Sequence, residues 1–170
     1  MSSRTRRNLP STKEVLALPA SSHCVTPTEW EDMNGHVTVP AHYEFHMRSV
    51  TVELQRLGWT ENYLERHGKT LFSVEQHLSF YDEVLIGQEV STHIRLLNHN
   101  ERMLHGISIL VNRATGVVAN TVEFIEGHVD LNTRRTIPFE PELRDSLARC
   151  LIEHRRLPWS VPLNSGMGLR

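Results

Sequence analysis

WEDMNGHVTVPAHYEFHMRSVTVELQRLG, residues 30–58, joins a short polar loop to the clearest helical pattern in the chain. Large side chains recur every three or four residues, which places them on one face of a helix: Tyr43, Met47, Val50, Leu54 and Leu57. Thr38 or Val39 can cap this helix, and Pro40 suits its first turn because proline has no N–H to leave unpaired there. Gly58 suits the position just past its end. The pattern predicts a helix from Val39 to about Leu57.

After this helix the pattern changes to a period of two, which is typical of strands. A second short helix from Thr60 to His67, closed by Gly68, comes first. One strand then alternates, with Phe72, Val74, Gln76, Leu78 and Phe80 on one face and Ser73, Glu75, His77 and Ser79 on the other. Further strands are expected over residues 90–96, 103–112 and 117–130. Their short links predict that each pairs with its neighbour in sequence, as an antiparallel meander.

These elements indicate one α+β domain. A first strand is expected from about His23 to Thr28, which gives a five-stranded antiparallel sheet. A sheet with one apolar face needs a cover, and the long amphipathic helix can supply it. Length alone favours a single domain. We expect a flexible tail over 1–22, the main domain over 23–141, and a peripheral C-terminal helix and tail over 142–170.

Composition excludes several functional classes. The formal net charge is −2, which gives no electrostatic case for nucleic acid or an anionic membrane as partner. No apolar run approaches the ~20 residues of a membrane span. Eleven histidines are scattered without the spacing of metal ligands, so no metal site is predicted. Cys24 and Cys150 lie far apart, which favours a reducing compartment and hence the cytoplasm. Residues 1–13 are rich in arginine and serine, as organellar transit peptides are, but we interpret them as a disordered tail.

Asp32 is the first candidate for chemistry. Gly35 lets the chain turn sharply between Asp32 and the start of the helix. Free amides of the first turn, near Val39 and Ala41, would form a pocket that stabilises an anion. A thioester or ester carbonyl polarised there could be attacked by the carboxylate, or by a water that it activates. Aspartate is also a frequent turn residue, and by spacing alone that structural role is the commoner one.

Other polar side chains offer weaker signals. His36 could be a general base or could orient the loop, and lone histidines are more often structural. Glu75 and His77 share one strand face, which is either solvated or lines a pocket at a dimer interface. Aromatic residues flank the same region, either as packing or as a box for a cation such as a quaternary ammonium: Trp30, Tyr43, Phe72, Phe80 and Tyr81.

The segment TEWEDMNGH, residues 28–36, followed by Tyr43, resembles the hotdog-fold acyl-CoA thioesterases of the 4-hydroxybenzoyl-CoA thioesterase type. Their signature has an Asp three residues before a Gly, then a helix with a Tyr in its second turn. The betainyl-CoA thioesterase-like branch resembles the chain more closely, with P-x-W-x-D-x-N-G-H and later T-V-E-x-H. FSVEQH, residues 72–77, fits the second part with Ser73 in place of Thr. Three further blocks are similar to that branch: residues 87–89, 96–101 and 127–130.

The match to this signature has departures that bear on the substrate. Thr28 separates Pro27 from the Glu-Trp pair, and Met33 stands where an aromatic residue is common. Thr38 and Val39 replace the Asn-rich run of the commoner hotdog signature.

The resemblance implies a hotdog fold and an enzyme that hydrolyses a small acyl-CoA thioester to the free acid and CoA. Betainyl-CoA giving betaine, in carnitine metabolism, is one candidate reaction. Asp32 would be the nucleophile or general base, the Val39 amide would polarise the carbonyl, and Gly35 would permit the close approach. With His36 these form the implied catalytic set. The implied substrate-binding set is Trp30, Asn34, Tyr43, Phe72, Glu75 and His77. No cofactor is implied, because CoA is part of the substrate.

Such enzymes are homodimers or dimers of dimers with the site between protomers. Basic residues would hold the CoA phosphates, and the candidates are Arg95, Arg102, Arg113, Arg134 and Arg135. One alternative is a non-catalytic hotdog module for acyl-CoA binding or assembly. Another is a hotdog hydratase or dehydratase that pairs Asp32 with His36, although the signature spacing argues against it.

Overall fold

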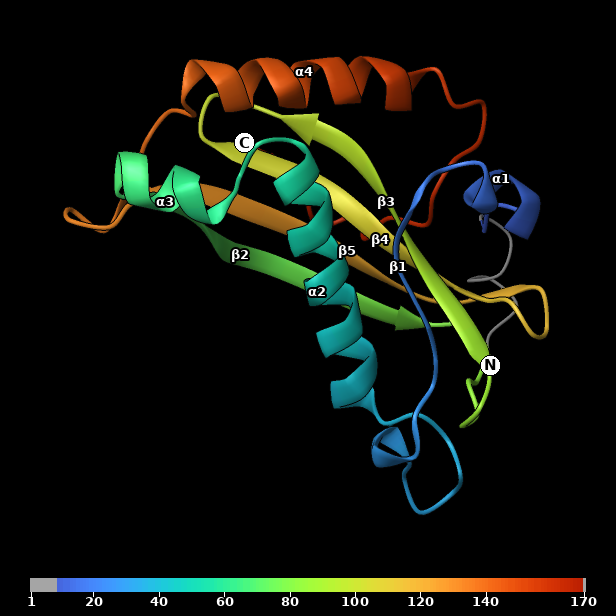
Figure 1. Cartoon of the computed structure of the whole chain (residues 1–170). Helices are drawn as coiled ribbons and strands as arrows, with labels where there is room; N and C mark the ends of the chain where they lie inside the picture. Colours follow the sequence, from blue (N-terminus) through green and yellow to red (C-terminus); the bar gives the residue numbers. More distant parts are fainter. Residues whose placement is uncertain (1–8, 170) are drawn as a thin grey trace.

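The computed structural model describes residues 9–169, which form a curled antiparallel sheet with one long helix lying across its concave side (Figure 1). The arginine-rich residues 1–8, on which the question of targeting depends, lie outside the described residues. The expected α+β hotdog architecture is confirmed, including a peripheral helix near the C-terminus. Within residues 9–169, no helix combines the length and apolar character needed to span a bilayer.

Five long strands and one short strand make up the sheet, in the order β1-β3-β4-β5-β2 with β6 paired to β5. They are β1 Ala20–Val25, β2 Lys69–Phe80, β3 Glu89–His99, β4 Met103–Asn112, β5 Val117–Asp130 and β6 Arg135–Thr136. The expected meander is correct for β3, β4 and β5 but wrong for β2, which pairs with β5 and not with β3. The reason lies in the link of residues 81–88, which is longer than a hairpin turn. It carries the chain from one edge of the sheet to β3.

The central helix α2, Val39–Arg56, ends within one residue of its expected limit. Thr38 is its cap and Pro40 lies in its first turn, as predicted, while Gly58 follows it with φ +108°. The short helix α3, Glu61–His67, is capped by Thr60 and closed by Gly68 in the left-handed conformation. These boundaries agree with the sequence because each is set by local chemistry that tertiary packing did not override.

We call the sheet face that contacts α2 the inner face. It packs against α2, α3 and the C-terminal helix α4, Pro141–Arg155. Side chains from all of these layers share one cluster: Val50, Leu54, Tyr63, Ile94, Leu96, Leu104, Phe124, Phe139, Leu143, Leu147 and Leu151. The cluster fixes α2 against the middle of the sheet, and so fixes where its N-terminus emerges.

The opposite sheet face, which we call the outer face, is covered by both ends of the described chain. A helix not expected from the sequence, α1 Thr12–Leu16, buries Val15 completely there, and Trp159 packs into the same cluster. Helix α1 begins with a capping box in which Ser11 and Glu14 bond each other's backbone N–H. Ordered chain therefore begins before residue 22, the expected end of the tail. Likewise, the segment after α4 is anchored rather than loose at Trp159.

Candidate active site

The loop of residues 31–37 projects from the body of the fold at the N-terminal end of α2 (Figure 1). The N–H of Thr38 donates to the Trp30 carbonyl at 2.8 Å, and the N–H of Asp32 donates to the His36 carbonyl at 2.8 Å. Gly35 has φ +80°, in the region that L side chains rarely adopt. The loop is therefore closed on itself and leads directly into the helix.

Asp32 is held as a carboxylate by its own loop. Its Oδ1 accepts from the backbone N–H of Asn34 at 2.8 Å and of His36 at 3.0 Å, while the Asn34 side chain lies 3.4 Å from Oδ2. The His36 and Asn34 N–H donors keep the pKa of the Asp32 carboxyl below its usual value. Oδ2 accepts only the long Asn34 contact, so it is the oxygen better placed to react.

Val39 occupies the first position of α2, where a backbone N–H has no partner within the helix. The Ala41 amide, also expected to be free, instead donates to Thr38 Oγ1 at 3.4 Å, because the capping threonine reaches back to it. Pro40 has no N–H. Of the two amides expected to be free, the Val39 N–H therefore remains as the candidate donor, on a residue that is 57% exposed.

The ring of His36 pairs with Glu83 and makes no hydrogen bond to Asp32 among the described residues. Its Nε2 lies 3.1 Å from Glu83 Oε2, and both side chains are solvent-exposed. The His36 backbone also forms a bridge with Leu85. These contacts tie the loop to the link after β2. The imidazole–carboxylate pair that a hydratase would need is therefore not formed between Asp32 and His36.

Trp30 and Tyr43, both expected to bind substrate, lie on opposite flanks of α2. The Trp30 ring packs on Phe45 with centroids 5.6 Å apart, on the flank next to β1. The Tyr43 hydroxyl donates to Gln76 Oε1 of β2. Tyr81 is buried in the outer-face cluster and bonds Thr121. The aromatic box, which the sequence offered as an alternative to simple packing, is thus not assembled within one chain.

The structure places Phe72, Glu75 and His77 on the outer face of β2. The expected alternation is wrong at this point, because a bulge between Ser73 and Glu75 inserts one extra residue. Ser73 faces inward, where it donates to Glu126, and Gln76 faces inward toward Tyr43. Phe72 therefore shares the outer face with Glu75 and His77. Within one chain these residues are separated from Asp32 by the sheet.

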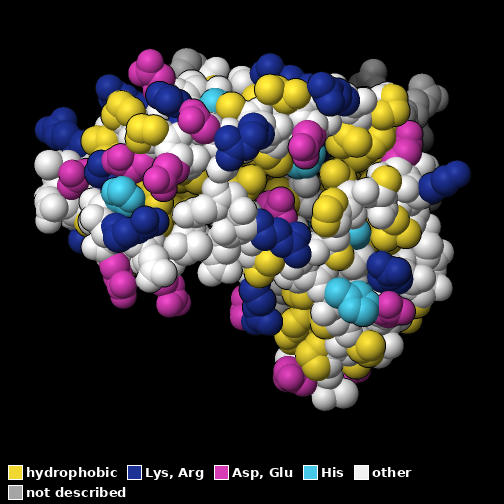
Figure 2. Space-filling model, turned by 45° about the horizontal axis from the view of Figure 1, so that its top comes forward, with side chains coloured by type: hydrophobic (Ala, Val, Ile, Leu, Met, Phe, Trp, Pro, Cys, Tyr) yellow, Lys and Arg dark blue, Asp and Glu magenta, His cyan; other side chains and the backbone are white. Residues whose placement is uncertain are grey.

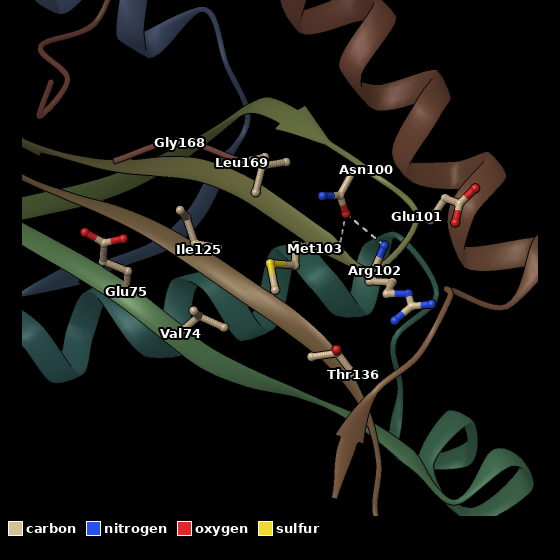
Figure 3. A pocket seen from close by; sticks show the side chains of 10 residues that line it. All are labelled: Val74, Glu75, Asn100, Glu101, Arg102, Met103, Ile125, Thr136, Gly168 and Leu169. Atoms are coloured by element: carbon tan, nitrogen blue, oxygen red, sulfur yellow. Dashed lines mark hydrogen bonds between the residues drawn. The ribbon is translucent and has the colours of Figure 1, made fainter. Parts of the chain in front are cut away.

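Glu75 lines a groove of about 650 Å³ on the outer face, and Figure 3 shows its carboxylate at one end and the Arg102 guanidinium at the other. The remaining lining residues are Val74, Asn100, Glu101, Met103, Ile125, Thr136, Gly168 and Leu169. Nearby, His77 Nδ1 lies 3.0 Å from Asn164 Nδ2. Of the candidate arginines, Arg102 is the one that lines this groove together with the predicted substrate residue Glu75.

Two of the other candidate arginines have structural contacts. Arg95 donates to the carbonyls of Trp159 at 2.5 Å and His154 at 3.2 Å, and its guanidinium lies 4.3 Å from the centre of the Trp159 ring. Arg113 lies 3.4 Å from Glu89. Arg134 is in the turn after β5 with φ +57°, and Arg135 is in β6. Figure 2 shows acidic and basic side chains intermingled over the face it presents.

A buried chain of polar side chains under the first half of α2 was missed from the sequence. His46 Nδ1 lies 2.7 Å from Ser108 Oγ, and His46 Nε2 lies 2.6 Å from Asn120 Oδ1. Asn120 Nδ2 lies 3.0 Å from His42 Nδ1. The signal was present, because His42 and His46 are four residues apart on one helical face.

Burial lowers the pKa of both histidines to about 4, so each imidazole is neutral at physiological pH. The ring of His42 meets Phe80 of β2 edge-on, with centroids 5.5 Å apart. Among residues 9–169, no three His, Cys, Asp or Glu side chains gather as a metal site would require.

Comparison with known proteins gives the same family as these residues. The profile of the Thioesterase-like superfamily matches residues 26–147, which include the Asp32 loop, α2 and β2 to β5. A betainyl-CoA thioesterase of Pseudomonas aeruginosa is 29% identical over 141 residues, covering 83% of this chain and 89% of the relative. A Rhizobium meliloti protein named L-carnitine dehydrogenase/betainyl-CoA thioesterase is 27% identical over 128 residues, which are 75% of this chain and 26% of that protein.

Solved structures share the fold. A Staphylococcus aureus protein in complex with CoA superposes with a TM-score of 0.81 at 18% identity, covering 90% of this chain and 97% of the other. A 1,4-dihydroxy-2-naphthoyl-CoA thioesterase from Synechocystis superposes with a TM-score of 0.67 at 9% identity, covering 75% and 93%.

Proposed function

The chain belongs to the Thioesterase-like superfamily, and we propose that it hydrolyses a small acyl-CoA thioester to the free acid and CoA, using Asp32. The observation that carries the assignment to Asp32 is its ionised carboxylate, held in a closed loop that opens directly into the N-terminus of α2. Both roles open to it, nucleophile and general base, require the ionised form.

In the general-base form of the reaction, Asp32 takes a proton from a water as the water oxygen bonds to the thioester carbon. The carbonyl oxygen gains the electron pair and the resulting negative charge. The intermediate then collapses, the C–S bond breaks, and the departing CoA thiolate takes the proton back from Asp32, which is again a carboxylate. Atoms and charge balance with water as the only co-substrate.

The N-terminus of α2 supplies stabilisation for the charge that develops on the oxygen. The Val39 N–H has no partner within the helix, and the aligned peptide dipoles place partial positive charge there. A donor of this kind typically contributes 10²–10³ in kcat. Gly35 lets the loop turn back closely enough to bring the carboxylate toward this helix end.

For the acyl group we propose betaine, because the Pseudomonas aeruginosa relative is named for betainyl-CoA. A trimethylammonium group is stabilised by aromatic faces and by a carboxylate. Tyr43 is well exposed beside the start of α2, Trp30 is partly exposed, and Glu75 supplies a carboxylate from β2. Thiol release from betainyl-CoA, compared with short, aromatic and long straight-chain acyl-CoAs, tests this choice.

The catalytic role is tested by Asp32→Asn, with Asp130→Asn as a matched control. Asp130 sits in the same kind of turn, where its Oδ1 accepts from the N–H of Asn132 at 2.7 Å and of Thr133 at 3.0 Å. Asparagine keeps an acceptor oxygen in both turns. We expect Asp32→Asn to lower kcat by at least about 10³, as removal of a catalytic group does. Asp130→Asn should retain wild-type kcat, with both variants folded by circular dichroism.

Equal activity of the two variants would exclude Asp32 as the reacting carboxylate. If wild-type protein releases no thiol from any acyl-CoA in the panel, the hydrolase assignment itself fails and a binding or assembly module is favoured. Turnover in H₂¹⁸O tests the nucleophilic role of Asp32. Label found in Asp32 by mass spectrometry identifies it as a nucleophile.

We also propose that the site is completed by a second copy of the chain, in a homodimer or a dimer of dimers. Strand β2 is an edge strand, and residues 72–75 on it are all exposed. Phe72, Val74 and Phe80 are large apolar side chains left at the surface along this edge. Such an edge favours pairing with another strand. Glu75 and His77 would then contribute at the interface, with Arg102 as a contact for the CoA moiety.

Cys24 and Cys150 are both free thiols, which supports the cytoplasm as location.

A further inference from the structure

The buried polar chain under α2 has a direction. Asn120 Oδ1 can only accept, so His46 donates through Nε2–H and its Nδ1 accepts from the Ser108 hydroxyl. The Asn120 amide nitrogen can only donate, so His42 accepts at Nδ1. A neutral imidazole carries one proton, which for His42 is therefore on Nε2. This series of hydrogen bonds holds His42 in the tautomer that carries the proton on Nε2. The Nε2–H group is left as the free donor at the end of the series.

This unpartnered N–H lies in the first turns of α2, at the edge of the core. Among the described residues, the buried side-chain nitrogens and oxygens without a partner are Trp59 Nε1 and Arg95 Nε. His42 as a residue is only 5% exposed, but its Nε2 has no hydrogen-bond partner among the described residues and is not one of these fully buried atoms, so it lies at the edge of the core. His42 is three residues after Val39 and contacts Phe80, whose side chain is exposed at the end of β2.

We propose that His42 is a second catalytic residue, whose Nε2–H donates to the thioester carbonyl oxygen as negative charge develops on it. The inference rests on the proposed function, and it adds a side-chain donor to the backbone donor of Val39. Donors aligned in one direction polarise each other, so the Ser108–His46–Asn120 chain strengthens the His42 N–H as a donor.

The protonation state of His42 suits this role. Burial keeps its pKa near 4, so the imidazole stays neutral and donates without giving up its proton. In the reaction the carbonyl oxygen gains an electron pair and accepts the N–H hydrogen bond. When the C–S bond breaks, the pair returns to the carbonyl and His42 is unchanged. Asp32 and water account for all proton transfers.

The first test compares His42→Leu, His42→Gln and Ser49→Ala. Leucine removes the donor at similar volume, whereas glutamine can accept from Asn120 and still present an N–H. Ser49 is also buried on α2 and bonds Thr92 of β3 at 2.5 Å, so its alanine variant loses a comparable helix–sheet contact one turn beyond His46. We expect His42→Leu to lower kcat by about 10²–10³ with KM within about threefold, as loss of an oxyanion donor does. Glutamine should recover at least a tenth of wild-type kcat, and Ser49→Ala should retain nearly all of it.

A second measurement does not depend on any variant folding. Wild-type protein labelled with ¹⁵N-histidine is titrated with a ketone analogue of the acyl-CoA in which CH₂ replaces the thioester sulfur. The proposal expects His42 in the Nε2–H tautomer at pH 7 and a downfield shift of that proton on binding.

The outcomes separate the two proposals. If wild-type protein hydrolyses acyl-CoA while His42→Leu keeps wild-type kcat, or the His42 proton is unmoved by bound analogue, the His42 role is overturned and the hydrolase assignment stands. A loss of kcat in Ser49→Ala equal to that in His42→Leu would assign the effect to general helix packing and also overturn the role. If wild-type protein releases no thiol, both proposals fall together.

Discussion

Asp32 and Asp130 share one local geometry, and we propose a catalytic role for Asp32 alone. Each Oδ1 accepts two backbone N–H groups from the residues that follow, and each carboxyl has its pKa lowered mainly by those donors. The difference is what comes next in the chain. The loop of Asp32 leads into the N-terminus of an 18-residue helix, whereas Asp130 leads into the turn before β6. The backbone donors of the turn favour the ionised form of the carboxyl. The groups around the carboxylate then decide whether it can take part in a reaction.

The neutral histidines at the centre of the fold predict acid sensitivity. His42 and His46 have folded-state pKa values of about 4, below the unfolded value of 6.5. Between these values the unfolded chain binds more protons, so stability is complete above pH 6.5 and is lost as pH falls toward 4. Each histidine should lower the free energy of unfolding by about 2 kcal/mol between pH 7 and pH 5. Urea unfolding at these two pH values measures the loss.

The His46→Gln variant supplies the control for this pH dependence. It should show a slope against pH that is smaller by about one proton. Burial raises the pKa of Glu126, which acts in the opposite sense, because a folded state that binds more protons gains stability as pH falls. A wild-type free energy of unfolding that stays flat from pH 7 to pH 5 would contradict neutral burial of the histidines.

At the scale of elements, the sequence predicted the helices well because local chemistry sets their ends. Thr38, Gly58, Thr60 and Gly68 all occupy the cap or closing positions expected of them. The sequence also placed Asp32 in a polar loop just before the helix, as the structure has it, because Gly35 and the helix start are local features. The low pKa of Asp32 follows from hydrogen bonds within five residues, and so was within reach of the sequence.

What could not be predicted depends on contacts distant in sequence. The pairing of β2 with β5 results from closing the sheet around α2, and no local pattern encodes it. The bulge between Ser73 and Glu75 reverses the faces of Phe72 and Val74, and strict alternation hides such an insertion. The His42–Asn120 contact joins positions 78 residues apart. Helix α1 was missed because its single turn is stabilised by burying Val15 against the sheet rather than by its own length.

Gly106 on β4 has no room for a larger side chain. A Cβ added there would lie 2.5 Å from Cζ of Phe124, which is directly opposite on β5 and only 1% exposed. Gly106→Ala should therefore lower the free energy of unfolding by about 1–3 kcal/mol, since overpacking a close-packed core forces side chains from their preferred rotamers. Urea unfolding measures the change. Gly168→Ala is the control, because its Cβ would meet no atom within 4 Å.

The double variant Gly106→Ala/Phe124→Leu should recover part of the lost stability by making room for the methyl group. If Gly106→Ala is as stable as Gly168→Ala, the strand pair is looser than the structure describes.

At the scale of the whole molecule, the exposed edge of β2 predicts self-association. Val74 is 54% exposed on the edge strand, and Ile152 on α4 is 53% exposed, far from that edge. Val74→Lys should weaken the dimer at least roughly tenfold, because edge lysines oppose strand pairing. Ile152→Lys should leave the dimer intact. Size-exclusion chromatography with light scattering across a concentration series measures both.

Thioesterase activity should fall together with dimer content in Val74→Lys, because the proposed site needs residues of both copies. A fully active monomer of this variant would show that one chain contains the complete site.

The outer face of the sheet is already occupied by the molecule's own ends, with Val15 from α1 and Trp159 from the C-terminal segment packed on Ile107 and Ile109. This covered part of the outer face is not available for a back-to-back stack of two dimers, whereas the groove beside Glu75 stays open. If four copies assemble, we expect the two dimers to meet away from this covered part of the outer face. The same arrangement makes α1 and the segment around Trp159 part of the hydrophobic packing of the sheet. A fusion partner or affinity tag attached near Trp159 would therefore disturb the packing on the sheet.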